Sequence, residues 1–156
     1  MKSEPDAFSI DDLKACPKGI EPWDGIRNYQ ARNFMRDRMS VGDRAFFYHS
    51  NCKVPGIVGV MTIASEPYPD PTQFDQKSQY FDSKSSPEEP RWLLRDVQYV
   101  RHTDRVISLT EIKAHADKLD DFALVRKGNR LSIMPVTDAQ WDYLIELEKS
   151  PGNLDE

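Results

Sequence analysis

The sequence predicts a mixed α/β domain whose small, strongly curved or barrel-like sheet is surrounded by short helices. Three observations predict this class: strand-like segments recur at uneven spacing, the helical segments between them are short, and strands and helices do not alternate regularly. Regular alternation would indicate a doubly wound sheet, so that class is disfavoured. A chain of 156 residues fits one domain. We expect this domain to cover residues 1–149 and a tail to follow at 150–156.

Two helices are predicted in the first third of the chain. Ser9, with Asp12 three residues later, is typical of a helix N-cap and predicts a helix over 10–15 that ends before Pro17 and Gly19. After a turn at Asp24-Gly25, a second helix is predicted over 28–39. Its inward stripe at helical spacing consists of Tyr29, Phe34, Met35 and Met39.

The central part of the chain predicts two strands and a long loop. Residues 44–50 are aromatic and strand-like, and 57–65 form a near-continuous apolar run that is typical of a strand covered on both faces. Gly59 inside this run predicts a bulge or a close backbone approach. The stretch 67–90 has five prolines and no periodicity but keeps four aromatic residues, so we expect a loop that packs down on the body.

The last third predicts further short elements. Strands are predicted over 91–100 and 129–136, and a short turn of helix is predicted near 120–127. Two helices have N-terminal capping pairs, Ser108 with Glu111 and Thr137 with Gln140, and the second of these helices directs Trp141, Leu144 and Ile145 inward.

Composition narrows the function classes. Mean hydropathy is −0.67 and no apolar run approaches the ~18 residues of a spanning helix, which argues against a membrane protein. The first residues lack the apolar stretch of a secretory signal, so we expect a cytoplasmic protein. The net charge of −5 disfavours binding of nucleic acid over the whole surface, although residues 27–44 are locally basic and allow a basic face.

The sequence does not predict an enzyme. Its three histidines lack metal-ligand spacing, and Cys16 and Cys52 form no C-x-x-C pair, so we expect no metal and no cofactor. His49 and Ser50 are neighbours on a predicted strand and point to opposite faces, which disfavours a base and nucleophile pair. The chain has no glycine-rich phosphate loop. A hydrolase, and a domain that binds a small ligand or a protein, remain the alternatives.

A binding function is favoured by two tryptophans. Trp23 and Trp92 adjoin arginine or polar residues, whereas Trp141 has a clean core pattern. Aromatic rings stack on nucleobases, and nearby polar groups can read the edge of an unpaired base, as a pocket for an extruded base requires. The alternative interpretation is that Trp23 and Trp92 are core residues near the surface.

Ordered motifs along almost the whole chain resemble those of the EVE domain family: "MKSEPD", "WDGIRNYQARNFMR", "GDRAFFYHS", "PGIVGV", "YPDPTQFD", "PRWLLRDV" and "RLSIMPVT". The resemblance implies a PUA-like curved pseudo-barrel sheet with peripheral short helices. It also implies a non-enzymatic reader of a modified base, with modified cytosine in DNA favoured and a modified RNA base as the other candidate. Members usually carry a short apolar strand before "KSEP"; because this sequence starts within that motif, we expect a shortened start or a differently built sheet edge.

The same resemblance implies site residues. For the base pocket it implies Ser3, Trp23, Asn28, Tyr48, His49, Ser50 and Trp92. For phosphate contacts at the rim it implies Lys2, Lys127, Arg130 and Ser132. Arg27 and Arg32 also fit phosphate contact, with a solvated helix face as the alternative. The expected partner is therefore nucleic acid that carries a modified base.

Overall fold

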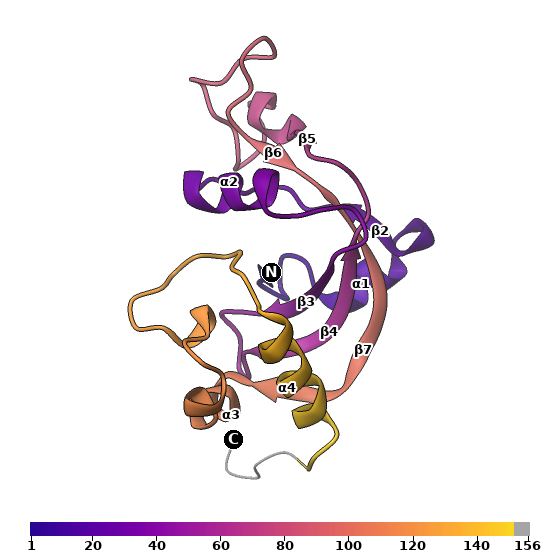
Figure 1. Cartoon of the computed structure of the whole chain (residues 1–156). Coiled ribbons are helices and arrows are strands. Elements are labelled where there is room, and N and C mark those ends of the chain that lie inside the picture. Colours follow the sequence, from indigo (N-terminus) through magenta and orange to yellow (C-terminus); the bar gives the residue numbers. More distant parts are fainter. Residues whose placement is uncertain (152–156) are drawn as a thin grey trace.

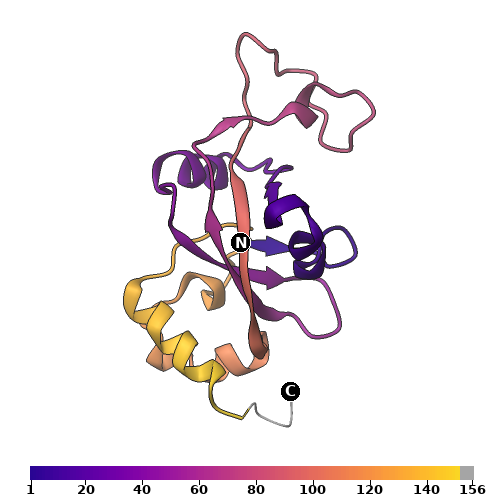
Figure 2. The ribbon, with the colours of Figure 1, turned by 90° about the vertical axis from the view of Figure 1, so that its right-hand side faces the viewer.

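The computed structural model describes residues 1–151 and contains a curled, five-stranded sheet with short helices at both ends (Figures 1 and 2). The strand order is β1-β3-β4-β7-β2, with β1 parallel to β3 and the other pairs antiparallel. The bounds of these strands are Lys2–Ser3 (β1), Ile20–Pro22 (β2), Arg44–His49 (β3), Gly56–Ile63 (β4) and Asp96–Ser108 (β7). The predicted mixed α/β class with a strongly curved sheet is confirmed.

The helices lie in two groups that cover different parts of the sheet. The helices α1 and α2 pack on one core with Trp23, Met35 and Phe47, while α3 and α4 pack on a second core around Phe46 and Trp141. The bounds of the helices are Ile10–Ala15 (α1), Tyr29–Asp37 (α2), Leu109–Ala114 (α3) and Asp138–Glu148 (α4). No helix among residues 1–151 is both long enough and apolar enough to span a bilayer.

Local capping signals predicted the helix starts correctly. Ser9 and Thr137 each form a complete capping box at the starts of α1 and α4. Ser108 accepts from the Glu111 amide at the start of α3, as predicted, whereas the cap of α2, Asn28, which accepts from the Ala31 amide, was not predicted. Gly59 lies at a register shift between β4 and β7, and a side chain there would meet Ile10 and the Arg101 backbone, so the predicted bulge and close approach are both confirmed.

Three predictions of local structure were wrong. The segment 129–136 is irregular backbone and not a strand, although Ile133 is buried and the Lys2 amide donates to the Ser132 carbonyl at 2.8 Å. The predicted strand at 91–100 is divided: Leu93–Leu94 (β6) pairs with Tyr68–Pro69 (β5), and β7 then begins at Asp96. Tyr29 does not face the core, because 49% of its surface is exposed.

The remaining expected segments are shorter than predicted or incompletely described. The turn near 120–127 is a 3₁₀ turn at Ala123–Val125, and another 3₁₀ turn, Pro71–Phe74, lies in the long loop. That loop projects from the end of the molecule next to α2 (Figure 1). Of the predicted tail at 150–156, residues 152–156 lie outside the described residues.

Candidate nucleic-acid interface

The connection between β2 and α2, residues 23–28, is held in one conformation by its backbone. The Trp23 amide donates to the Arg95 carbonyl at 2.9 Å, and the Gly25 amide donates to Oδ2 of Asp70 at 2.9 Å. Gly25 has a φ of 81°, and a side chain at this position would overlap the Tyr80 ring, so this turn requires glycine. The segment is therefore a fixed platform for the side chains that it carries.

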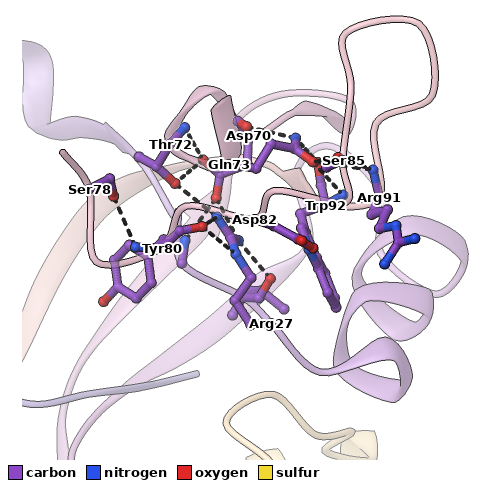
Figure 3. Close-up of polar contacts among 12 residues, drawn as sticks. Arg27, Asp70, Thr72, Gln73, Ser78, Tyr80, Asp82, Ser85, Arg91 and Trp92 are labelled. Carbon is purple, nitrogen blue, oxygen red and sulfur yellow. Dashed lines mark hydrogen bonds and ion pairs between the residues drawn. The ribbon is translucent and has the colours of Figure 1, made fainter. Parts of the chain in front are cut away.

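Arg27 ties this connection to the long loop (Figure 3). Its Nη1 lies 3.1 Å from Oδ2 of Asp70, and its other donors bond the Thr72 hydroxyl and the carbonyls of Tyr80 and Ile26. These contacts use all five N–H groups of the guanidinium. No donor of Arg27 is left for a phosphate in this conformation, which leaves the expected rim role of Arg27 without a free group.

Asp70 and Gln73 are fully buried partners within the same network. Burial alone would raise the pKa of Asp70, but hydrogen bonds from Thr72, the Gly25 amide and Arg27 lower it below its ordinary value. The Gln73 side chain donates to the carbonyls of Asp70 and Trp92 and accepts from the Trp92 amide. The base of the long loop thus packs on the body as expected, while its far end projects (Figures 1 and 3).

Three aromatic rings and two guanidinium groups pack together at the start of α2. The Arg27 guanidinium lies 5.5 Å from the centroids of both the Tyr80 and the Trp92 rings. Trp92 stacks on Tyr29 with centroids 4.7 Å apart and planes 24° apart. Arg32 lies 4.6 Å from the Tyr29 centroid. We call Tyr80, Arg27, Trp92, Tyr29 and Arg32 the aromatic–arginine ladder; each member is held by at least one other.

The two tryptophans of the expected base pocket lie in different surroundings. Trp23 is 7% exposed, and its ring meets the edge of Phe47 at 5.3 Å in the core. Trp92 is 6% exposed and donates from Nε1 to Asp82 at 2.8 Å, a bond that lowers the pKa of that carboxyl. Neither ring lines the two cavities described below. A cage between them would require movement of at least one ring.

Of the pocket residues expected on the sheet edge, Ser3, His49 and Ser50 lie side by side, whereas Tyr48 packs in the second core around Phe46 and Trp141. Ser3 pairs with His49 across β1 and β3, and the Ser50 amide donates to the Ser3 carbonyl at 3.0 Å. The Ser3 hydroxyl donates to the Phe8 carbonyl, and His49 accepts from the Ile10 amide through Nε2. Burial lowers the pKa of His49, so the imidazole is neutral near pH 7. His49 and Trp23 both contact Phe47, which links the two halves of the expected pocket.

Two adjoining cavities lie beside Lys2 and Tyr48. The larger, about 560 Å³, lies between β3, α2 and residues 133–136 and is lined by charged as well as apolar side chains. The smaller, about 300 Å³, is lined by Lys2, Lys113 and Lys127, and none of its lining residues within 1–151 is acidic. Burial lowers the pKa of Lys2 and raises that of Tyr48 to about 12. This arrangement brings the expected phosphate contacts Lys2 and Lys127 together; Arg130 is exposed and Ser132 is half-buried.

Two polar side-chain groups in the fixed connection have no partner among the described residues. The carboxylate of Asp24 receives no hydrogen bond from another residue, and the Asn28 amide nitrogen is likewise free, because only its oxygen caps α2. Burial, followed by the nearby charges of Asp70 and Glu21, raises the pKa of Asp24. An acceptor and a donor are therefore available next to Trp23.

Sequence reasoning missed several residues that organise this region. Asp70 and Gln73 lie in the long loop, whose lack of periodicity gave no signal for their partners. Tyr29 was assigned to the core because of its helical spacing. Helical spacing alone does not show which side of α2 the Tyr29 ring occupies.

Comparison with known proteins gives consistent matches. The family model described as "EVE domain" matches residues 1–147. Thymocyte nuclear protein 1 of Gallus gallus is 50% identical over 164 residues, which cover 96% of this chain and 67% of that protein. Thymocyte nuclear protein 1 of Homo sapiens is 46% identical over 165 residues, which cover 96% of this chain and 72% of that protein.

Solved structures match over nearly the full chain. Human THYN1 protein, solved in complex with 5-methylcytosine-containing DNA, has a TM-score of 0.91 and 45% identity, with 97% of each chain covered. A protein from Pseudomonas putida has a TM-score of 0.89 and 48% identity, with 95% of this chain and 97% of that chain covered. These matches confirm the fold that the sequence resemblance implied.

Proposed function

This chain belongs to the EVE domain family, and from that membership we propose that it is a non-enzymatic reader of modified cytosine in DNA. The observation that carries the proposal is the likeness, at 45% identity and a TM-score of 0.91, to a human protein solved with 5-methylcytosine-containing DNA. The fixed connection at residues 23–28 supports it, because that connection offers free polar groups beside aromatic rings and arginines.

The base site that we propose lies between that connection and the edge of the sheet. It comprises the residues implied by the family resemblance, Ser3, Trp23, Asn28, Tyr48, His49, Ser50 and Trp92, together with Asp24. The support is that Trp23 and His49 share the contact with Phe47, and that Asp24 and Asn28 keep unpaired groups. Because Trp23 is only 7% exposed, we propose that the pocket opens when an extruded base enters.

A methyl pocket alone does not define a reader of methylated cytosine. Filling an apolar gap with one methyl group contributes ~0.8 kcal/mol, about a fourfold preference over unmodified cytosine. Thymine carries the same methyl group and differs at position 4, where cytosine has an amino donor and thymine an acceptor. The free carboxylate of Asp24 is suited to accept from that amino group and would leave thymine without a partner.

Phosphate groups are proposed to bind at the smaller cavity. Lys2, Lys113 and Lys127 line it without a neutralising acid, and none of these ammonium groups has an ion-pair partner among the described residues. Arg32, Arg130 and Ser132 complete the proposed rim. Arg32 uses three of its five N–H groups on Asn33 and the Arg91 carbonyl, whereas Arg27 uses all five within the chain and is left out.

The other classes predict different behaviour. A hydrolase or nucleic-acid-processing enzyme would change the covalent structure of an oligonucleotide, and a small-ligand or protein-interaction domain would bind oligonucleotides weakly and without salt dependence. The relatives carry the word nuclear in their name, whereas the cytoplasmic address expected from the sequence stays a prediction for this chain. A modified RNA base also stays a candidate ligand.

Calorimetric titration tests the proposal. Matched DNA duplexes that differ only in one 5-methyl group, and an RNA strand with the same methylated base, would be titrated into the full chain at two salt concentrations. We expect tighter binding to methylated DNA, affinity that falls as salt rises, and oligonucleotides of unchanged mass afterwards. Equal binding to both duplexes would contradict the reader function. Tighter binding to the RNA strand would show that the ligand is modified RNA and not modified DNA.

A further inference from the structure

Tyr29 is the most exposed of the large aromatic side chains on the described surface. It is 49% exposed, compared with 38% for Phe81 and 37% for Tyr68. Tyr29 is the first residue of α2 and follows Asn28, whose amide nitrogen is free. An exposed aromatic ring beside a proposed base site offers a surface on which a base can stack.

The ring of Tyr29 is fixed from behind. Trp92 stacks on it at 4.7 Å, and Trp92 is itself held by Asp82 at Nε1 and lies against the Arg27 guanidinium. Arg27 is in turn held by five hydrogen bonds. Because Tyr29 is already ordered, a molecule that stacks on it loses little affinity to the ordering of this side chain.

One face of the Tyr29 ring is open. The Arg32 guanidinium lies 4.6 Å from the Tyr29 centroid, and the Tyr29 and Trp92 centroids are 4.7 Å apart. If Arg32 covered the face of Tyr29 opposite Trp92, its distance from the Trp92 centroid would approach the sum of these two distances. The observed distance is 6.0 Å, so Arg32 lies at the side of the stacked pair. The Arg32 guanidinium thus lies beside the outer face of Tyr29 and does not cover it.

The surroundings of this face match a polyanion. Arg32 and Asn33 follow Tyr29 by three and four positions on α2 and so share its side of the helix, and the Arg32 guanidinium lies 4.6 Å from the ring centroid. An aromatic face combined with a nearby cation is the arrangement that binds single bases and their phosphates. A protein partner would instead be expected at a larger apolar patch.

We infer that the open face of Tyr29 stacks on a nucleobase adjacent to the recognised nucleotide, while Arg32 contacts the phosphate beside that base. This inference rests on the proposed function and adds a contact that the family motifs did not nominate. Extrusion of one base exposes the faces of its neighbours, and stacking of Tyr29 on one of them offsets part of that loss.

Three variants of the full chain test the inference. Tyr29→Leu removes the ring, Tyr29→Phe keeps it, and Phe81→Leu removes a similarly exposed ring from the long loop as a control. Each would be titrated with a methylated duplex that carries 2-aminopurine next to the methylated cytosine, and a thermal melt would confirm folding. We expect Tyr29→Leu to bind about fivefold or more weakly and to abolish the 2-aminopurine fluorescence change. Tyr29→Phe and Phe81→Leu should bind like the parent.

The outcomes separate this inference from the proposed function. If the parent prefers methylated DNA and Tyr29→Leu binds equally well, the stacking contact is wrong while the reader function stands. If Tyr29→Phe loses as much affinity as Tyr29→Leu, the hydroxyl and not the ring makes the contact, which also overturns the inference. If the parent binds no oligonucleotide, both proposals are wrong.

Discussion

Arg27 and Asp70, 43 positions apart in sequence, join the start of α2 to the long loop through an ion pair of 3.1 Å in which Asp70 is fully buried. The pair fixes two elements at once, because Asp70 also accepts from the Gly25 amide and from Thr72. Everything proposed for the interface depends on this junction, since Trp92 and Tyr29 pack against Arg27 and its partners.

We predict that Arg27→Ala acts on stability. The change leaves the Asp70 carboxylate buried without its cation, which costs about 3 to 5 kcal/mol for a buried pair. Chemical denaturation would measure the loss. The matched control is Arg36→Ala, whose pair with Asp37 is exposed and screened by solvent, so its loss should leave the free energy of unfolding nearly unchanged. If Arg27→Ala is as stable as the parent but its DNA binding depends less on salt, Arg27 contacts a DNA phosphate and the stability account is wrong.

The stability that Asp70 contributes should depend on pH. Its pKa in the folded protein is held below the ordinary value, so its stabilising effect is fully present above the unfolded pKa near 4 and is lost as pH falls through the lower folded value. The difference in unfolding free energy between the parent and Asp70→Asn should therefore be large at pH 7 and shrink below about pH 4. A difference that stays constant between pH 7 and pH 2.5 would show that the charge of Asp70 is not involved.

Lys127 is predicted to contact phosphate and not the base. Removing one phosphate contact lowers the slope of log affinity against log salt by ~0.9 for duplex DNA. Lys127→Ala should thus weaken binding to methylated and unmethylated duplexes equally and reduce this slope, whereas Lys77→Ala in the long loop should change neither. An unchanged slope for Lys127→Ala would remove the smaller cavity from the interface.

Asp24 is predicted to distinguish methylated cytosine from thymine. Asp24→Asn places a donor and an acceptor where the parent has only acceptors, so the preference for methylated cytosine over thymine should fall by roughly tenfold, as expected for the loss of one base-edge contact of ~1 to 3 kcal/mol. Competition between duplexes with either base at one position measures it, with Asp37→Asn as the control. A preference that survives in Asp24→Asn would place the position-4 contact elsewhere.

The sequence predicted the parts of the fold that depend on local signals. The capping residues Ser9, Ser108 and Thr137 fix helix starts through bonds within three residues, which a sequence displays directly. The strand predicted over 129–136 was wrong. Ile133 fills the core from irregular backbone, and an apolar pattern in the sequence does not show whether a partner strand is present.

Long-range polar partners were beyond sequence reasoning. Arg95 is only 2% exposed and donates to the carbonyls of Met35, Arg36 and Met39, where it closes the C-terminal end of α2 from about 60 positions away. The same holds for the site: Lys2 and Lys127 were nominated by their motifs and lie at one cavity, whereas the roles of Arg27, Asp70 and Tyr29 depend on how the long loop returns to α2.

The most direct test of the central claim is a map of backbone amide chemical shifts in the full chain as methylated duplex is added. We predict that the largest changes fall on residues 23–33, on Trp92 and on the lysines of the smaller cavity, and that they are smaller with the unmethylated duplex. Changes concentrated on α4, or changes that are identical for the two duplexes, would contradict the proposed interface and its selectivity.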